Sequence, residues 1–234
     1  MACLLGTVWT ILTMADSAPH IDDNGDCIRR WIRLILLLDA AESAGLAPIQ
    51  VLQLHILAYM SNVLSPVWDI PVFDGKVLKR KGGPFYPSLQ SDLDRLVGMG
   101  VVIVSHISHE LDQDQRWHLE GSFRLHRVFA DGILQRVRTF RDEYELSHFV
   151  KELAYALSAL SNDDLGSATK EDATYADPMI DAGNVVDFAE WAKMNYSANA
   201  AQNFKHLIPG NAIATRGEML HLYVYHLYRR LQNV

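Results

Sequence analysis

The chain has few cysteines and no long apolar run. Cys3 and Cys27 are its only cysteines among 234 residues, too few for a disulfide framework or a four-cysteine zinc site. A reducing cytoplasm is therefore the expected compartment. No apolar run approaches the roughly 20 residues of a membrane-spanning helix. The apolar segment Met1–Met14 lacks the basic start of a signal peptide, so we expect it either to pack on the core or to precede a native start at Met14.

Motifs that cradle phosphate or activate a nucleophile are also missing. The sequence contains no G-x-S-x-G, H-E-x-x-H, P-loop or G-x-G-x-x-G pattern. Gly82-Gly83-Pro84 lacks the Gly-Lys-Ser/Thr of a phosphate loop, and we expect a turn there. We therefore expect neither enzymatic activity nor a cofactor. An enzyme with a scattered active site stays open, because missing motifs do not exclude one.

Ten histidines raise the question of a metal site. The closest pairs are His106 with His109, where Glu110 follows, and His221 with His226. A zinc site usually needs three or four ligands at recognised spacings, and a spacing of five places two helical side chains on different faces. We therefore expect no metal, and interpret these residues as surface or core histidines.

The charge of the chain is unevenly distributed. Its formal net charge is −7, and residues 142–190 hold 12 acidic side chains against 2 basic ones. The chain as a whole is not expected to coat nucleic acid, because phosphate binding requires positive charge. A basic run holds Lys76, Lys79, Arg80 and Lys81, which are candidate contacts to a DNA backbone. The same run also suits a solvated strand edge that resists aggregation.

Periodic apolar residues predict three helices followed by a hairpin. The helices span Cys27–Ala44, Pro48–Leu64 and Pro87–Val97. The β-branched run Val101–Val104 predicts a buried strand, and Arg116–His126 predicts the strand that returns after a polar turn. Helix, strand, turn and strand form the second half of a winged helix-turn-helix. We therefore predict a mainly α fold with a small β-wing.

Helices also dominate the second half of the sequence. We predict them at Val128–Val137, Glu143–Leu160, Val185–Lys193 and Glu218–Leu231, with a short acidic helix after Ser161. Phe188 and Trp191 would anchor the third of these. The predicted organisation is an N-terminal segment (1–26), a winged-helix-like domain (27–127) and a C-terminal helical region (128–234).

The last predicted helix is apolar over most of its circumference. Such a helix is buried on several sides, either in its own chain or under a partner. Its tyrosine and histidine positions, which include His226, are of types that suit interfaces that are partly wet and partly dry. The candidate partner contacts are Tyr223, Tyr225, Tyr228, Arg229 and Arg230.

The helix Pro87–Val97 argues against a sequence-specific DNA reader. Its predicted exposed positions include Gln90, Asp92 and Asp94, and Arg95 is its only cation. Two carboxylates that face a major groove would be repelled by phosphate. A protein-binding module is therefore the expected use of this fold, and a winged-helix DNA-binding transcriptional regulator is the alternative.

Three segments carry a resemblance to a known family. They are HILAYMSNVLSPVWD (55–69), DGKVLKRKGGPFYP (74–87) and LQSDLDRLVGMGVV (89–102). They resemble the middle component of bacterial ABC-three-component anti-phage defence systems of the Lamassu type, and the resemblance covers roughly Cys27–Val137. It implies a winged-helix accessory subunit of an SMC-like complex, with non-specific DNA contact inside that complex.

The resemblance also implies two partners, an SMC/Rad50-like ATPase and an effector nuclease. ATP binding and nuclease chemistry would belong to those partners, and this chain has motifs for neither. The expected function is therefore that of a non-catalytic scaffold that bridges the ATPase and the nuclease in the cytoplasm, away from any membrane.

Overall fold

The computed structural model describes residues 24–72, 76–111, 115, 117–178, 181–187, 195–206 and 214–232. The predicted N-terminal segment 1–26 lies outside the described residues except at its end, and so do the predicted anchors Phe188 and Trp191.

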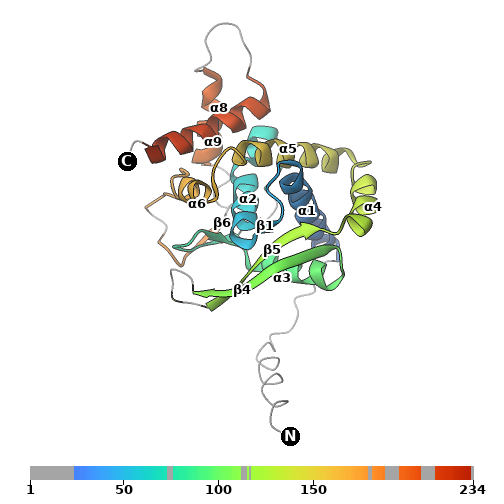
Figure 1. Ribbon diagram of the computed structural model, residues 1–234. Coiled ribbons are helices and arrows are strands. Elements are labelled where there is room, and N and C mark those ends of the chain that lie inside the picture. The colour runs from blue at the N-terminus through green and yellow to red at the C-terminus, as the bar shows by residue number, and fades with distance from the viewer. Residues whose placement is uncertain are drawn as a thin grey trace, which may run out of the picture.

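The described chain is mainly helical, with two small antiparallel sheets (Figure 1), which confirms the predicted class at that level. The α-helices are α1 (Asn24–Ser43), α2 (Val51–Leu64), α3 (Pro87–Gly98), α4 (Arg127–Val137), α5 (Arg141–Leu157), α6 (Asn162–Lys170), α8 (Tyr196–Asn203) and α9 (Arg216–Gln232). The 3₁₀ turns are η1 (Ser65–Trp68) and η2 (Phe204–His206). The strands are β1 (Ile49–Gln50), β2 (Lys76–Lys79), β3 (Pro84–Phe85), β4 (Val102–Leu111), β5 (Trp117–Leu125) and β6 (Val185–Asp187).

Helix α2 is the centre of the fold. All of its residues except Leu52 are buried. Helices α1, α5, α6 and α8 all pack against it, and α5 lies across α1 and α2 in Figure 1. A helix with apolar residues on every side is stable in water only inside such a shell. The core that results is continuous from α1 to α9.

The first sheet has the order β1-β5-β4. Strand β1, which the sequence did not predict, pairs with β5 over two residues only. Strands β4 and β5 form a long hairpin that ends with Leu111 opposite Trp117, so β4 extends seven residues beyond the predicted strand end at Val104. One extra residue on β4 makes a bulge between Ser105 and Ser108.

The second sheet joins the two halves of the sequence in the order β3-β2-β6. The prediction of a helix that begins at Val185 is wrong, because residues 185–187 form β6. Val186 lies opposite Val77 of β2, and both are buried. Burial of this β-branched pair outweighs the local helical pattern. The predicted domain boundary lies between residues 127 and 128, but β2 and β6, from opposite sides of it, belong to the same sheet. Residues from both sides also share one hydrophobic core.

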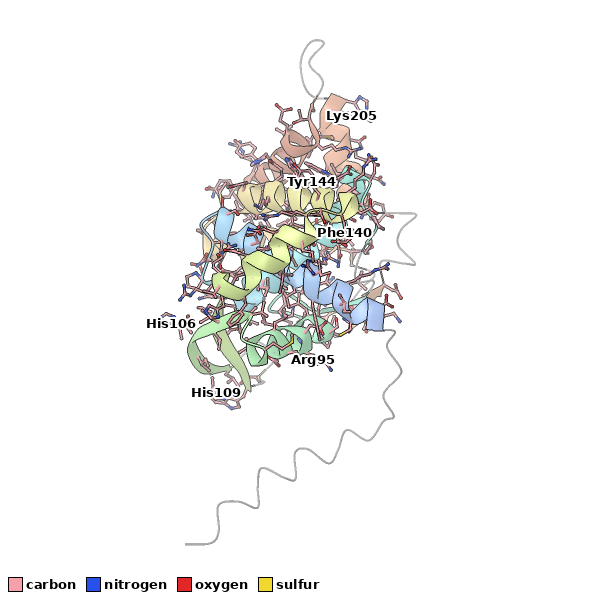
Figure 2. All side chains as sticks on the ribbon, turned by 90° about the vertical axis from the view of Figure 1, so that its right-hand side faces the viewer. Arg95, His106, His109, Phe140, Tyr144 and Lys205 are labelled. Carbon is pink, nitrogen blue, oxygen red and sulfur yellow. The ribbon has the colours of Figure 1, made fainter. Side chains whose placement is uncertain are left out.

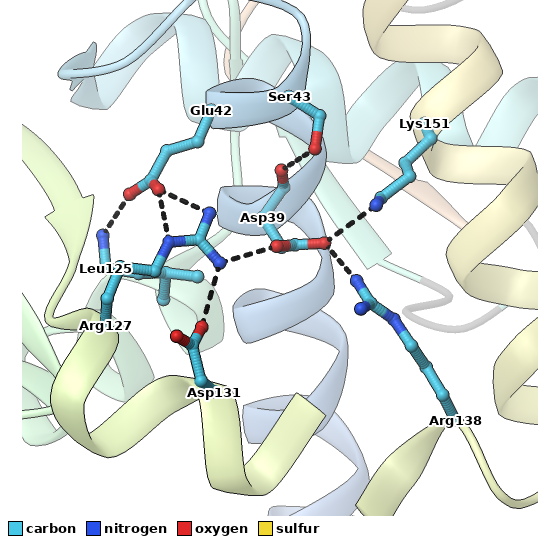
Figure 3. A network of polar contacts seen from close by, with 8 residues as sticks. All are labelled: Asp39, Glu42, Ser43, Leu125, Arg127, Asp131, Arg138 and Lys151. Atoms are coloured by element: carbon cyan, nitrogen blue, oxygen red, sulfur yellow. Dashed lines mark hydrogen bonds and ion pairs between the residues drawn. The ribbon is translucent and has the colours of Figure 1, made fainter. Parts of the chain in front are cut away.

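A buried carboxylate ties α1 to the elements that follow the hairpin (Figure 3). Asp39 is only 4% exposed and binds three cations: Arg127 Nη1 at 2.8 Å, Arg138 Nη2 at 2.5 Å and Lys151 Nζ at 3.3 Å. One turn later, Glu42 accepts the Arg127 Nε–H at 2.7 Å. Burial alone raises the pKa of Asp39, but the Arg127 hydrogen bond and the Lys151 and Arg138 charges outweigh it, so this pKa lies below its usual value.

A second buried carboxylate, Asp172, ties α9 to α2. It is fully buried and accepts hydrogen bonds from the hydroxyls of Tyr59 (2.7 Å), Tyr223 (2.6 Å) and Ser197 (2.9 Å), and from the Thr174 and Tyr175 N–H groups. Burial, followed by the Asp172 charge, raises the pKa of Tyr223 well above its usual value. Both tyrosines are therefore protonated donors at neutral pH.

We predict that Tyr223→Phe destabilises the fold by roughly 1–3 kcal/mol, because it removes one donor from a buried carboxylate and changes little else. Urea unfolding at neutral pH measures this as a lower midpoint at unchanged slope. The matched control is Tyr225→Phe on the same helix, where the side chain is 57% exposed. Equal midpoints for the two variants would contradict the assigned role of Asp172.

Candidate interaction surfaces

The basic run is partly consumed by contacts within the chain. Lys79 Nζ donates to the Asp177 carbonyl at 3.1 Å and lies 5.4 Å from the centre of the Tyr175 ring. Burial lowers the pKa of Lys79. The Arg80 guanidinium stacks on the Phe85 ring at 3.6 Å. These contacts stabilise the sheet around β2, and they hold the Lys79 and Arg80 side chains against their own chain.

Only two of the four predicted DNA contacts keep well-exposed side chains. Lys76 is 73% exposed in its side chain and lies 3.8 Å from Asp187 Oδ2. Lys81 is exposed in the turn between β2 and β3. Four residues were predicted to contact a DNA backbone together: Lys76, Lys79, Arg80 and Lys81. Only Lys76 and Lys81 remain well exposed for such contacts.

We predict weak DNA binding with a log–log salt slope of about −1.8, which corresponds to two phosphate contacts, rather than the roughly −3.6 of four. A salt titration with a duplex of random sequence measures this slope. Lys76→Glu with Lys81→Glu should abolish binding, whereas Lys205→Glu, an exposed lysine on η2 (Figure 2), should leave the slope unchanged. A slope near that of four contacts, or a strong sequence preference, would contradict this account of the basic run.

Helix α3 presents fewer carboxylates than its sequence indicates. Asp92, predicted to be exposed, is only 2% exposed. It accepts the Trp31 Nε1–H at 2.9 Å and the Arg30 Nε–H at 2.8 Å, which attaches α3 to α1. The prediction was wrong because a paired acid can occupy the inner face of an amphipathic helix. Asp94 and Arg95 remain exposed, so the outer face of α3 carries one charge of each sign.

His55 of α2 lies beneath the basic run. It is 2% exposed, its Nδ1 accepts the Tyr86 N–H at 3.2 Å, and its ring centre lies 4.8 Å from that of Phe85. Burial lowers the pKa of His55 to about 3; the Gln90 side chain opposes this shift, and the Arg80 charge adds to it. The imidazole is therefore a neutral packing group at physiological pH.

We predict that His55 makes the protein sensitive to mild acid. Its pKa is about 6.5 unfolded and about 3 folded, so between these values only the unfolded state takes up the proton. The stability that neutral His55 contributes is complete above pH 6.5 and is lost as the pH falls, by up to about 1.4 kcal/mol per pH unit.

Urea unfolding midpoints between pH 7 and pH 4 test this prediction. His55→Gln should flatten the pH dependence, whereas the control His221→Gln, at an exposed position of α9, should leave it unchanged. The assignment is wrong if the wild type and His55→Gln lose stability in parallel.

Helix α9 presents fewer residues to a partner than predicted. Its buried stripe is Leu220, Tyr223, Val224 and Leu227, which packs on α5, α6 and α8. Tyr223 is 1% exposed, so its assignment as a partner contact is wrong. The tyrosine hydroxyl had suggested a partly wet interface. It instead donates a hydrogen bond to the buried carboxylate of Asp172 within the same chain. The alternative that this helix completes the core of its own chain accounts for the stripe.

The outer side of α9 keeps the other candidate contacts. Tyr225 is 57% exposed, Tyr228 is half-buried, and Arg229 and Arg230 are exposed. Arg230 also forms an ion pair with Glu171 at 3.1 Å.

Large apolar side chains are exposed at two places that the sequence reasoning missed. The first is the start of α4 and the corner between α4 and α5, where Val128 is 82%, Phe129 54%, Phe140 62% and Tyr144 56% exposed. Figure 2 shows Phe140 and Tyr144 close together at the start of α5. Buried Ala130, Leu134 and Val137 define the inner stripe of α4, so apolar residues outside that stripe were the available signal.

The second place is the outer end of the β4–β5 hairpin. Ile107 is 57%, Leu111 46% and Trp117 72% exposed. Leu111 and Trp117 are directly opposite each other, so their side chains share one face. The signal in the sequence is the pair of apolar residues Ile107 and Leu111, which are spaced for one face of a strand. It was missed because a polar turn was expected in this segment.

A polar cleft of about 670 Å³ separates the start of α1 from the start of α5. Arginines line its α1 side and carboxylates line its α5 side: Arg29, Arg30, Arg33, Asp142, Glu143 and Glu145. Burial raises the pKa of Glu143. Among the described residues that line the cleft there is no histidine or cysteine, so its wall offers no base–nucleophile pair of the Ser–His or Cys–His type.

The histidine pairs are not part of a three-ligand group among the side chains that the structure describes, and the side chain of Glu110 lies outside these. No group of three or more His, Cys, Asp or Glu side chains in the described part of the chain is placed to hold an ion. His106 and His109 are exposed on the hairpin (Figure 2), and the nearest carboxylate to His221 is Glu152, at 4.0 Å.

None of the described helices has the length and apolarity that a membrane crossing requires. No family model, no curated protein and no solved structure matches the chain.

Proposed function

We propose that this chain is a non-catalytic winged-helix subunit of a bacterial anti-phage defence complex of the Lamassu type. In that complex it would bridge an SMC/Rad50-like ATPase and an effector nuclease. The segments 55–69, 74–87 and 89–102 supply the resemblance to the middle component of such systems.

The order of elements supports the winged-helix part of the proposal. Helices α1, α2 and α3 precede the β4–β5 hairpin, and β1 between α1 and α2 completes the sheet in the order β1-β5-β4. In this interpretation α2 and α3 are the helix pair and the hairpin is the wing. The β2–β3 hairpin is an insertion between the two helices, and it is held by β6.

The observation that carries the scaffold role is the aromatic corner at the start of α5. Phe140 and Tyr144 lie one helical turn apart with their side chains mostly exposed, beside Arg141, whose side chain is 88% exposed (Figure 2). Aromatic residues and arginine are the types enriched in protein interfaces. Two cations of the basic run stabilise its own sheet instead, which favours a protein partner over DNA as the main ligand.

The second candidate function is a winged-helix transcriptional regulator. One observation favours it: with Asp92 buried, only Asp94 opposes DNA on the outer face of α3, where Arg95 is also exposed. The slope of the salt titration above separates the two candidates, because a regulator that makes more phosphate contacts than two requires a steeper slope.

We predict that Phe140→Ser with Tyr144→Ser weakens recovery of the partner subunits by more than about tenfold, the loss expected for interface anchors. The experiment is co-expression with the products of the flanking genes, followed by pull-down on the tagged chain. Tyr155→Ser is the control, since Tyr155 lies on the same helix and is 45% exposed.

The terminal helix is tested in the same assay with Arg229→Glu plus Arg230→Glu, which should weaken assembly and leave the isolated fold intact. A wild-type chain that recovers none of its neighbours' products would overturn the scaffold role, and the regulator would become the better explanation.

A further inference from the structure

The β4–β5 hairpin extends its apolar face beyond the body of the molecule. Along β5, Leu125 and Phe123 are buried, and Trp117, on the same face by the two-residue period of a strand, is 72% exposed. Leu111 opposite Trp117 is 46% exposed. In Figure 1 the hairpin lies below α1, α2 and α5, and its outer end extends to the left of α3. One face of the hairpin therefore packs on the core at the end near Leu125, and the same face is exposed at the end near Trp117.

The outer edge of β4 is also open. β4 is the last strand of its sheet, so in the described part of the chain no strand pairs with that edge. Natural edge strands are usually protected by lysines, by proline or by shortness. β4 is ten residues long, contains no proline, and has Glu110 as its one formally charged residue. Its bulge lies between Ser105 and Ser108 and includes Ile107, and residues 108–111 pair regularly with β5. The chain as a whole has a net charge of −7, but β4 holds only one of its charged residues. Electrostatic repulsion between two copies of this strand edge is therefore small.

We propose that the outer half of β4 pairs antiparallel with the same strand of a second copy of this chain. A two-fold axis perpendicular to the sheet keeps each face on its own side, so only residues of equal parity can lie opposite each other. With His109 opposite its own copy on the axis, Ile107 of each chain lies beside Leu111 of the other. Four exposed apolar side chains then meet in two symmetric pairs.

This register also uses the uncovered end of the hairpin. Because the strands run in opposite directions, the hairpin tip of one copy extends alongside the inner half of β4 in the other, where the helical body covers the same face. Each Trp117–Leu111 pair is thereby brought toward the partner's body. One arrangement therefore accounts for the open edge, for its lack of charge and for the exposed Trp117.

The first test is the mass of the purified full chain by light scattering over a concentration series. We expect a dimer, with twice the 26.4 kDa of one chain. Ile107→Lys, which replaces one apolar side chain in each Ile107–Leu111 pair by a charged one, should give a monomer with unchanged circular dichroism. Val128→Lys is the matched control, an exposed apolar residue on α4, and should remain a dimer. A wild-type monomer at every concentration overturns the proposal, as does a dimer that persists in Ile107→Lys.

The second test fixes the register. In a background with Cys3→Ser and Cys27→Ser, His109→Cys should form an intermolecular disulfide, because directly opposed Cα atoms lie about 4.5–5.5 Å apart. His106→Cys should not, because this register separates the two copies of residue 106 by about 20 Å. Cross-linking of residue 106 but not of residue 109 contradicts the register. Neither test uses a partner protein, so failure here is distinguishable from failure of the scaffold role.

Discussion

The position of Asp39 near the end of α1 is the constraint on which much of the fold depends. A carboxylate that is 4% exposed is tolerated only with charged or hydrogen-bonding partners, and here three cations come from three later segments. Arg127 begins α4, Arg138 follows it, and Lys151 lies on α5. Through Arg127 and the Leu125 N–H, Glu42 adds the end of β5 to the same group. About one turn of α1, from Asp39 to Glu42, therefore fixes the direction of the hairpin and of the α4–α5 corner, which carry the exposed apolar residues.

Asp172 performs the corresponding task for α2 and the C-terminal helices, with different chemistry. Its donors among the described residues are the hydroxyls of Tyr59, Tyr223 and Ser197 and two backbone N–H groups, and none of these donors is a cation. Neutral donors can stabilise a buried charge when several converge on it, and each also satisfies its own hydrogen-bonding need. Because these donors come from α2, α8 and α9 and from the loop after α6, the carboxylate holds the C-terminal helices in one arrangement. The two acids together explain why residues on both sides of position 127 share a single core.

Local patterns in the sequence were sufficient for most helices and insufficient for contacts between distant segments. The helices predicted at Cys27–Ala44, Pro87–Val97 and Val128–Val137 match α1, α3 and α4 within three residues at each end, because an apolar stripe and a Gly or polar boundary are local signals. β1 and β6 were missed, because a strand of two or three residues exists only through its partner, here β5 or β2.

The predicted exposure of two residues, Asp92 and Tyr223, was wrong for a related reason. Residue type predicted exposure correctly for Lys76, Lys81, Tyr225 and Arg229, but it failed where a polar group is consumed by a distant one. Asp92 is bound by Trp31 and Arg30, and Tyr223 by Asp172, over separations of 51 to 62 residues. No periodicity within one helix contains that information.

The use that the fold makes of its polar residues bears on function. Within the described residues, the buried ionisable side chains Arg33, Asp39, His55, Asp92 and Asp172 all bond to an element other than their own. These buried groups are thus occupied with joining elements of the fold, and of the five only Arg33 also lines the cleft between the starts of α1 and α5. What remains for recognition is the exposed surface, and its distinctive groups are aromatic and aliphatic: Trp117, Phe129, Phe140, Tyr144 and Tyr225. An architecture that spends its polar groups on rigidity and presents apolar side chains at fixed positions suits a protein that positions other proteins.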